Sequence, residues 1–599
     1  MTAYPLIRTK WSNEHIMAAL FAVLVLYLLP QWLDKPGELF GFAVLLLFGL
    51  LIDVAANMFR YHKPVCAVSA AVTTAMLELL TPGVPLWGRL LGVSFALIIG
   101  KHIWGGTGKN PFNPAAAGLF FMSILFVVEF PPFYAAVLLV PAMLFSLPFA
   151  GFRPFAAGGM ILGMLAAMLT SGELSIINML SYGVVFWGCL VITDPATVTP
   201  DPLIGLMSGL LAGFLPLYLS GTVWALALGI LAVNTVSAVT ADNRGKAISL
   251  ARLSFKGRKP FHYSIDEVKL IDAVGEETGY NGEMPELSSD QIMSRIRENN
   301  VFGFGGAAYS VYDKIMAVMS CGSKAGHLVV NGVECDPGLI HDKWILKRFP
   351  NEILHGIDII SKIMSFESIV LAVKDGEICH VPESVKLHKV ADYYPVGAEK
   401  TLIKEVLGKE IPYGAFPAEQ GILVMNVQTV LAVYEAVYLN RKADTRFLTA
   451  ADLRNKKVQV VRVRLGAKIH ETVEAIYPGQ GYVFAGGGIM QAWLAEDEEV
   501  IDKKVNFLAV GRFPAYKESQ LCSKCGLCRR NCPEGLKVND IAKLVDEGKL
   551  KETEKLHAEK CIGCGSCSYV CLAGRNLSKR TLSAREFLRQ KAVRFCNVK

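Results

Sequence analysis

Eight of the 14 cysteines lie in two short runs near the carboxyl end of the chain. The first run is Cys522, Cys525, Cys528 and Cys532, followed by Pro533, and the second is Cys561, Cys564, Cys567 and Cys571. Both have the spacing C-x2-C-x2-C-x3-C, in which three thiolates of one run and the last cysteine of the other enclose a [4Fe–4S] cluster. We therefore predict two clusters, one held by Cys522, Cys525, Cys528 and Cys571 and the other by Cys561, Cys564, Cys567 and Cys532.

Zinc is the alternative ligand for so many thiolates. Structural zinc sites usually show two separated C-x2-C pairs, so two interlocked runs favour iron–sulfur clusters. Small residues support this interpretation, because Gly526, Gly563 and Gly565 let a loop wrap closely around a cluster. The other six cysteines have no metal spacing, and we interpret them as ordinary small apolar residues: Cys66, Cys189, Cys321, Cys335, Cys379 and Cys596.

A glycine-rich segment upstream of the cysteines could bind a phosphate. The loop 301–308 precedes an expected helix at 310–320 and expected strands at 327–331 and 368–373. Free N–H groups and the helix dipole converge at such a loop and attract anions. Loops of this composition are also often plain turns, so the segment by itself leaves both interpretations open.

The order of motifs through the second half of the chain resembles the C subunit of Rnf electron-transport complexes, which is related to the flavin- and NADH-binding subunit of respiratory complex I. The motifs are Gly303-Phe-Gly-Gly-Ala-Ala-Tyr with Lys314, Asn331-Gly-Val-Glu-Cys-Asp-Pro337, Tyr394-Pro-Val-Gly-Ala-Glu-Lys400 and the segment 417–429, followed by the two cysteine runs. The resemblance implies a flavin site lined by Gly303, Gly305, Gly306, Lys314, Asn331, Glu334 and Asn426. Relatives have Gly-Phe-Pro-Thr where this chain has Ala308-Tyr-Ser-Val311, so we expect any flavin here to be weakly held.

The first half of the chain is far more apolar than the second. Apolar residues make up 52% of the chain, and its net charge of +7 is too weak a field to indicate nucleic acid. Only about 8% of the residues before position 244 are charged. We predict about ten membrane-spanning segments of about 20 residues or fewer, near 15–33, 40–59, 65–81, 85–103, 113–130, 133–150, 155–170, 175–193, 203–220 and 222–240.

The distribution of Lys and Arg predicts the orientation. A cytoplasmic amino terminus puts most basic residues of the first half inside, together with the basic segment after Asp242, and leaves Lys35 and Arg89 outside. An even number of spans then returns the second half to the cytoplasm. Asp53 lies within a span, where a role in ion translocation competes with an ion pair to Arg60 near the cytoplasmic end, and we favour the pair.

Polar motifs in the first half resemble the D subunit of Rnf and the B subunit of the sodium-pumping NADH:quinone reductase. They are Ser69-Ala-Ala-Val-Thr-Thr74, the segment 100–115 and Thr193-Asp-Pro-Ala-Thr-Val-Thr-Pro200. Those relatives esterify flavin to a threonine in a Ser-Gly-Ala-Thr-like loop that this chain lacks, so the resemblance implies a noncovalent flavin, FMN or riboflavin, or a quinone. Prolines in the polar loops should break helices and leave backbone N–H groups available to it.

Together these features predict a membrane all-α bundle fused to a cytoplasmic α/β flavoprotein-like domain, a small β-rich SLBB-like domain and a two-cluster ferredoxin-like module. The expected boundaries are a transmembrane domain at 1–243, a basic linker at 244–289, the α/β domain at 290–450, the SLBB-like domain at 457–505, the ferredoxin-like module at 515–580 and a tail at 581–599.

We expect a multi-pass inner-membrane protein that passes electrons between a cytoplasmic donor, the two clusters and the flavin or quinone in the membrane half, as part of an Rnf-like complex. Its partners would be the lipid bilayer and other electron-transfer subunits or a soluble donor, ferredoxin or NADH. No residue need act as a catalytic acid or base. The alternative is an NADH- or ferredoxin-dependent FMN oxidoreductase, coupled or not to ion translocation.

Overall fold

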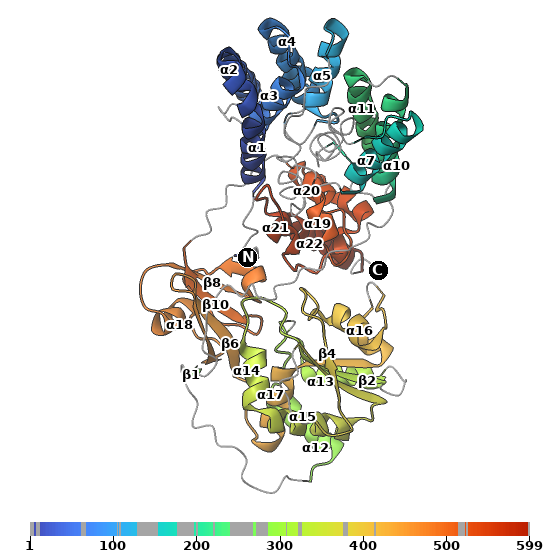
Figure 1. Ribbon diagram of the computed structural model, residues 1–599. Coiled ribbons are helices and arrows are strands. Elements are labelled where there is room, and N and C mark those ends of the chain that lie inside the picture. The colour runs from blue at the N-terminus through green and yellow to red at the C-terminus, as the bar shows by residue number, and fades with distance from the viewer. Residues whose placement is uncertain are drawn as a thin grey trace.

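The structure is a computed structural model (Figure 1), and the residues that it describes are 5–6, 12–61, 67–104, 106, 110–128, 154–175, 197–198, 202–219, 222–239, 268–270, 286–306, 308–320, 326–374, 381–412, 415–512, 522 and 525–596.

The first half is a bundle of apolar helices (Figure 1). Its described helices are α1 (Asn13–Asp34), α2 (Pro36–Tyr61), α3 (Val68–Leu80), α4 (Leu86–Leu97), the π-helix η1 (Ile98–His102), α5 (Pro114–Leu125), α7 (Pro154–Thr170), α10 (Pro202–Leu219) and α11 (Val223–Val239). Helices α1 and α2 contain apolar stretches of 21 and 25 residues, long enough to cross a membrane, whereas the other described apolar helices are shorter. The expected spans 133–150 and 175–193 lie outside the described residues, apart from Ser175.

Small residues allow close helix contacts in this bundle. A Cβ on Gly159 or Gly163 of α7 would lie 2.2 or 2.1 Å from a carbonyl oxygen of α10, and Gly209 and Gly213 of α10 meet α7 in the same way. Two glycines four residues apart on each helix are the pattern that lets membrane helices approach backbone to backbone. The sequence therefore specifies the α7–α10 pair by the absence of side chains at these positions.

The prediction that Asp53 forms an ion pair with Arg60 is wrong. Asp53 lies inside α2 and is bonded to Lys101 and His102 of η1, while Arg60 is exposed at the end of the same helix. The partner comes from another segment that folds against α2, which helical spacing alone does not reveal.

An α/β domain opens the second half. A four-stranded parallel sheet has the order β4 (Lys386–Lys389), β3 (Ser368–Val373), β2 (His327–Gly332) and β5 (Ile422–Asn426). Strands β2, β3 and β5 are mostly buried, as expected for a parallel sheet covered by helices. The helices are α12 (Ser289–Glu298), α13 (Val311–Ser320), α14 (His341–Arg348), α15 (Pro350–Ile363), α16 (Glu399–Leu407) and α17 (Val427–Tyr438).

A second sheet follows and is larger than the expected 457–505 region. Its order is β1 (Val268–Leu270), β7 (Lys457–Arg464), β6 (Thr445–Asp452), β10 (Phe507–Gly511), β8 (Tyr482–Gly486) and β9 (Ala492–Leu494), with helix α18 (Ile469–Ile476) and the short 3-10 helix η4 (Ile489–Gln491). Strand β6 pairs with both β7 and β10, so it belongs here although the sequence placed it with the α/β domain. Strand β1 comes from the expected linker.

The carboxyl-terminal module contains α19 (Leu527–Arg530), α20 (Val538–Asp546), α21 (Ser566–Tyr569) and α22 (Leu577–Cys596), and the two cysteine runs lie on and around α19 and α21. Figure 1 shows this module between the membrane bundle and the two domains with sheets. The amino-terminal segment also reaches the second half, because the backbone N–H of Leu6 donates to the carbonyl of Ile489 at 2.9 Å. Leu6 is buried there, so it packs against the second half.

Candidate functional site

The eight cysteine thiols gather in two groups that mix the two runs. Burial, together with neighbouring Cys525, Cys522 and Cys571, raises the pKa of Cys528 well above its usual value. Burial and the neighbours Cys564, Cys561 and Cys532 do the same for the pKa of Cys567, which also faces Cys528. A cavity of about 40 Å³ opens between the thiols of Cys522, Cys525, Cys528 and Cys571.

This arrangement fits an iron–sulfur cluster by its donor chemistry. The buried thiols of Cys528 and Cys567 resist ionisation, and a bound metal centre would make their thiolates the favoured form. The last cysteine of each run lies with the other run, as Cys571 faces Cys525 and Cys522, and Cys532 faces Cys564 and Cys561. The grouping is the one that crossed ligation requires.

Local geometry explains how each run forms its pocket. Gly526 and Gly565 have φ angles of 74° and 77°, a left-handed conformation that favours glycine, and each precedes a one-turn helix that carries the third cysteine. Both runs fold in the same way, and the last cysteine of each lies with the thiols of the other run.

The residues expected to line a flavin site lie mostly at one edge of the parallel sheet. Asn331 and Asn426 are in register at the carboxyl ends of β2 and β5. A Cβ on Gly305 would lie 3.5 Å from the Cβ of Asn426, so the glycine loop reaches the same edge. Ligands of open α/β sheets bind in the crevice at these strand ends. The bare backbone of Gly305 and Gly306 fits the close approach of a flat ring.

Lys314 has partners of its own. Its ammonium donates to the carboxylate of Glu399 at 2.8 Å and to the carbonyl of Val424 at 2.7 Å. Its charge is therefore compensated without a phosphate. Ala308 is a second departure from a typical flavin loop, because its φ of 55° lies in the left-handed region that a glycine would occupy without strain.

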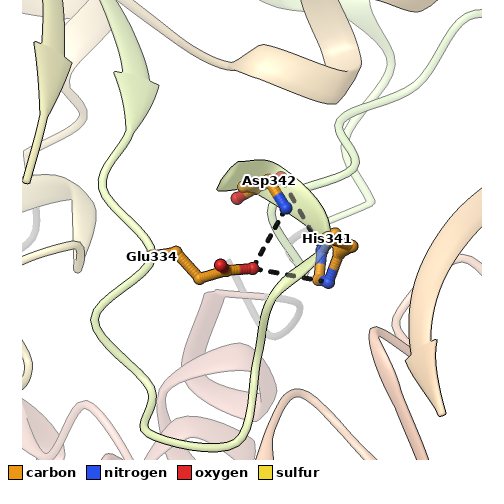
Figure 2. A group of neighbouring side chains, drawn as sticks. All are labelled: Glu334, His341 and Asp342. Carbon is orange, nitrogen blue, oxygen red and sulfur yellow. Dashed lines mark hydrogen bonds and ion pairs between the residues drawn. The ribbon is translucent and has the colours of Figure 1, made fainter. Parts of the chain in front are cut away.

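Glu334 follows β2 and forms a buried polar group with His341 and Asp342 (Figure 2). One of its carboxylate oxygens accepts the N–H of Asp342 at 3.0 Å and lies 3.6 Å from Nδ1 of His341. Burial and the nearby Asp342 raise the pKa of Glu334 to about 8. Burial, reinforced by the charge of Arg446, lowers the pKa of His341 to about 3.

The three side chains are close enough to share a metal ion, and each already makes a hydrogen bond, although Oδ1 of Asp342 has no hydrogen-bond partner among the described residues. Glu334 accepts a backbone N–H at the start of α14, and Nδ1 of His341 lies 3.0 Å from the hydroxyl of Thr449. Asp342 accepts from the amide of Asn426 at 2.7 Å. We therefore interpret the group as a network that fixes the sheet edge.

Sequence reasoning missed a contact between this sheet edge and the cysteine module. The carboxylate of Asp336, two residues after Glu334, accepts the N–H groups of Ile489 and Met490, both at 3.1 Å. The carbonyl oxygen of Met490 in turn lies 2.4 Å from the position that a Cβ on Gly565 would take. Asp336 lies inside the motif 331–337, so the sequence did mark this residue. No rule of spacing along the chain, however, connects that motif to residue 490.

Tyr394 makes a second connection. Its buried hydroxyl donates to the carbonyl oxygen of Cys564 at 2.7 Å. This places the thiol group of Cys532, Cys561, Cys564 and Cys567 against the α/β domain.

Arg446 of β6 was also missed. It is 1% exposed, and its guanidinium lies 5.5 Å from the ring centre of Phe304 and donates to the carbonyl of Phe304 at 3.3 Å. Burial lowers its pKa to about 10. A buried arginine under the glycine loop thus adds positive potential to the sheet edge, and its position depends on the second sheet.

Comparisons with known families match three parts of the chain. Residues 1–137 match the NQR2, RnfD, RnfE family, residues 296–435 match the Nuo51 FMN-binding domain, and residues 515–572 match the 4Fe-4S dicluster domain. The chain joins an RnfD-like membrane region to an RnfC-like redox region. These matches confirm the resemblance drawn from the sequence, and they support FMN and iron–sulfur clusters as cofactors of the redox region.

Several relatives match the RnfC-like region. The C subunit of the ion-translocating oxidoreductase complex of Buchnera aphidicola is 26% identical over 301 residues, covering 48% of this chain and 63% of the relative. The protein of the same name from Pseudomonas aeruginosa is 30% identical over 263 residues, covering 41% and 33%. The C subunit of the Na(+)-translocating ferredoxin:NAD(+) oxidoreductase complex of Acetobacterium woodii is 27% identical over 290 residues, covering 45% and 64%. The chain thus spans less than two thirds of each.

A solved structure, an NAD+-reducing [NiFe]-hydrogenase in the air-oxidized state, shares 14% identity with a TM-score of 0.38 and covers 50% of this chain and 66% of that chain. This likeness supports no functional argument.

Proposed function

We propose that the chain is an electron-transfer subunit of a membrane-bound Rnf-like complex. The observation that supports this most directly is the position of the cysteine module, which lies between the membrane bundle and the α/β domain (Figure 1) and is joined to the latter by the bond from Tyr394 to Cys564. The names of the relatives, which are members of oxidoreductase complexes, point the same way.

The two thiol groups would each hold one [4Fe–4S] cluster. We assign Cys522, Cys525, Cys528 and Cys571 to one cluster and Cys561, Cys564, Cys567 and Cys532 to the other. The second is next to the α/β domain, because Tyr394 contacts its loop, and Met490 of the second sheet contacts the same loop. It is therefore the cluster that exchanges electrons with that domain, and the first is the more distant one.

FMN would bind at the carboxyl edge of the parallel sheet. Gly303, Gly305 and Gly306 would offer bare backbone to its ring, and Asn331, Asn426 and Glu334 would present polar groups at the strand ends. When bound, the flavin supplies a carrier that can exchange electrons singly with a cluster and in pairs with a donor. Lys314 would reach a phosphate only by leaving Glu399, so we propose that the flavin is weakly held.

The rest of the assignment concerns the membrane. We propose ten spans, an amino terminus and second half in the cytoplasm at the inner membrane, and an SLBB-like role for the second sheet. The contact of Leu6 with Ile489 supports placing the terminus and the second half on one side. The electron acceptor of the membrane half would be a noncovalent flavin or a quinone near the loop 100–115. Other members of the complex, ferredoxin or NADH and the lipid bilayer would be the partners.

A cofactor inventory of the purified full chain tests this proposal. We expect about eight irons and about eight acid-labile sulfides per chain, together with substoichiometric flavin. Replacing Cys379, which lies outside both runs, should leave the iron content unchanged, whereas replacing Cys564 should remove about half of it. Iron below one cluster per chain, with zinc in its place, would exclude electron transfer through the module.

A second candidate is direct oxidation of NADH or ferredoxin on FMN in the α/β domain, and the match of residues 296–435 to an FMN-binding domain favours it. Mixing the purified protein with NADH under anaerobic conditions separates the two. Rapid bleaching of a flavin band supports this second candidate, and an unchanged band with clusters reducible by a low-potential dye supports the first.

A further inference from the structure

We propose that Tyr394 is a positioning residue for the second cluster, which holds the loop of Cys564 in place and raises the reduction potential of that cluster through a donated hydrogen bond. The inference rests on the proposed function, which assigns Cys564 as one of the ligands. It deepens that function, because it gives a residue of the α/β domain a role in the electron affinity of a centre whose thiols all come from another module.

The hydroxyl of Tyr394 lies between two fixed groups. Tyr394 is buried, with 4% of its surface exposed. Its hydroxyl oxygen accepts a hydrogen bond from the amide of Gln491 at 3.3 Å, and its O–H donates to the carbonyl oxygen of Cys564 at 2.7 Å. Gln491 belongs to η4, and its neighbour Met490 lies against the same cysteine loop. The hydroxyl hydrogen therefore points at the loop, and both domains with sheets help to direct it.

The four-residue turn that begins at Tyr394 and ends at Gly397 is anchored at its other end. The carbonyl of Gly397 accepts the side-chain amide of Asn331 at 3.0 Å, and the N–H of Gly397 donates to the sulfur of Cys335 at 3.3 Å. A Cβ on Gly397 would lie 2.5 Å from the carbonyl oxygen of Val333, so the turn packs directly on the chain that leaves β2. The Cα atoms at the two ends of the turn are at most about 11 Å apart. The turn thus joins the sheet edge, where we place the flavin, to the cysteine loop.

The two cysteine runs take the donor to this carbonyl from different places. Cys525 stands in the first run where Cys564 stands in the second, and its carbonyl accepts from the guanidinium of Arg530 at 3.5 Å. Arg530 is part of the first run itself, whereas the second run has Tyr569 in its place. The donor to Cys564 is instead Tyr394, which is 170 residues away along the chain. At this carbonyl the first loop is bonded from within its run, and the second is bonded from the α/β domain.

The direction of the effect follows from charge. Reduction adds one electron to the centre held by these thiolates, and no bond forms or breaks in the protein, because the hydroxyl of Tyr394 keeps its proton. The hydrogen of that hydroxyl is the positive end of its dipole and points at the loop of Cys564, so it stabilises the added negative charge. Hydrogen bonds around the ligands are among the factors that set cluster potentials.

A cationic donor to the same loop comes from within the module. Arg585 of α22 donates to the carbonyl of Cys561 at 3.0 Å. This bond also favours the reduced form, and it stays in place when Tyr394 is changed. A change at Tyr394 therefore isolates the contribution of the α/β domain.

Removing the hydroxyl and strengthening it as a donor should move the potential in opposite directions. The variant Y394F keeps the ring and loses the donor. The replacement Tyr394→3-fluorotyrosine keeps nearly the same size, and the electron-withdrawing fluorine makes the O–H a stronger donor. Y477F is the matched control, because the hydroxyl of Tyr477 donates to the carbonyl of Ala450 at 3.1 Å inside the second sheet.

The measurement is an anaerobic redox titration of each purified full chain, followed by the electron paramagnetic resonance signals of the two clusters. The variant C532S identifies the signal of the second cluster. We expect Y394F to lower the reduced-to-oxidised ratio of that cluster at a fixed potential by about two- to fivefold, the factor that a typical hydrogen bond contributes to an equilibrium. The fluorinated chain should raise the ratio. The first cluster, and both clusters of Y477F, should titrate as in wild type.

Three other results would contradict this role. An unchanged second cluster in Y394F, with both clusters present, would overturn the role of Tyr394 and leave the proposed electron transfer intact. Shifts of the same sign in the two variants of Tyr394, or equal shifts of both clusters, would show a general loosening of the loop and overturn the role as well. Wild-type chains without clusters would overturn both the role and the proposed function.

Discussion

Gly565 is the position where the cysteine module meets the second sheet most closely, and replacing it with alanine separates two physical effects. The φ of Gly565 is 77°, and a Cβ there would lie 2.4 Å from the carbonyl oxygen of Met490. Gly548 in the same module has a φ of 72° with no atom within 4 Å of its Cβ position. The G548A variant therefore carries the conformational strain alone, and G565A carries the strain plus the contact.

The expected magnitudes follow from this difference. A Cβ in the left-handed region costs about 1–2 kcal/mol, and the loss of glycine's extra unfolded-state freedom returns about 0.5–1 kcal/mol, so G548A should lose about 0–1.5 kcal/mol. In G565A the neighbouring atom is backbone, held by the bond from Met490 to Asp336, and cannot yield cheaply. Overpacking of this kind adds about 1–3 kcal/mol.

Urea unfolding of the purified full chain, followed by the visible circular dichroism of the iron–sulfur centres, reports this module specifically. The midpoint should fall further in G565A than in G548A, at similar slopes. Equal shifts in the two variants would refute the close packing of the cluster loop on Met490, and with it the contact route from the α/β domain to the nearer cluster.

Three further predictions concern the cofactors and the sheet edge. Replacing Cys571 with serine should alter the electron paramagnetic resonance signal of the cluster held mainly by the first run and leave the signal of the other cluster unchanged. The variant C532S should do the reverse. If each substitution instead affected the cluster of its own run, crossed ligation would be contradicted. The pKa of about 3 for buried His341 means that the folded state binds fewer protons than the unfolded state between pH 6.5 and 3. The contribution of this group to the free energy of unfolding is therefore complete above pH 6.5 and is lost as the pH falls. Relative to the variant H341N, the loss should be about 2 kcal/mol at pH 5. Urea-stability profiles that run parallel in the two proteins would show that His341 is not buried in its neutral form. Replacing Ala308 with glycine should remove the strain of its positive φ and stabilise the loop by up to about 1 kcal/mol. The variant should also retain more flavin on gel filtration. Unchanged retention would show that the loop does not limit flavin binding.

Short motifs with a fixed spacing along the chain were enough to indicate which families this protein resembles. The two cysteine runs and the motifs around Gly303, Asn331 and Asn426 each span a few residues, and the chemistry of each depends on distances along the chain. The resemblance implied Asn331 and Asn426 as flavin-site residues, and the register of β2 and β5 brings both to one edge of the sheet. These features were therefore available from the sequence.

Tertiary structure decided the contacts between segments. Asp53 pairs with η1 and not with Arg60, because a buried charge takes the partner that folding brings to it and helical spacing gives only candidates. Strand β6 joins the second sheet because its hydrogen-bonding edges meet β7 and β10. The same holds for Asp336 and Tyr394, whose bonds to the loops at residues 489–490 and 564 cross more than a hundred residues and depend on how whole domains pack.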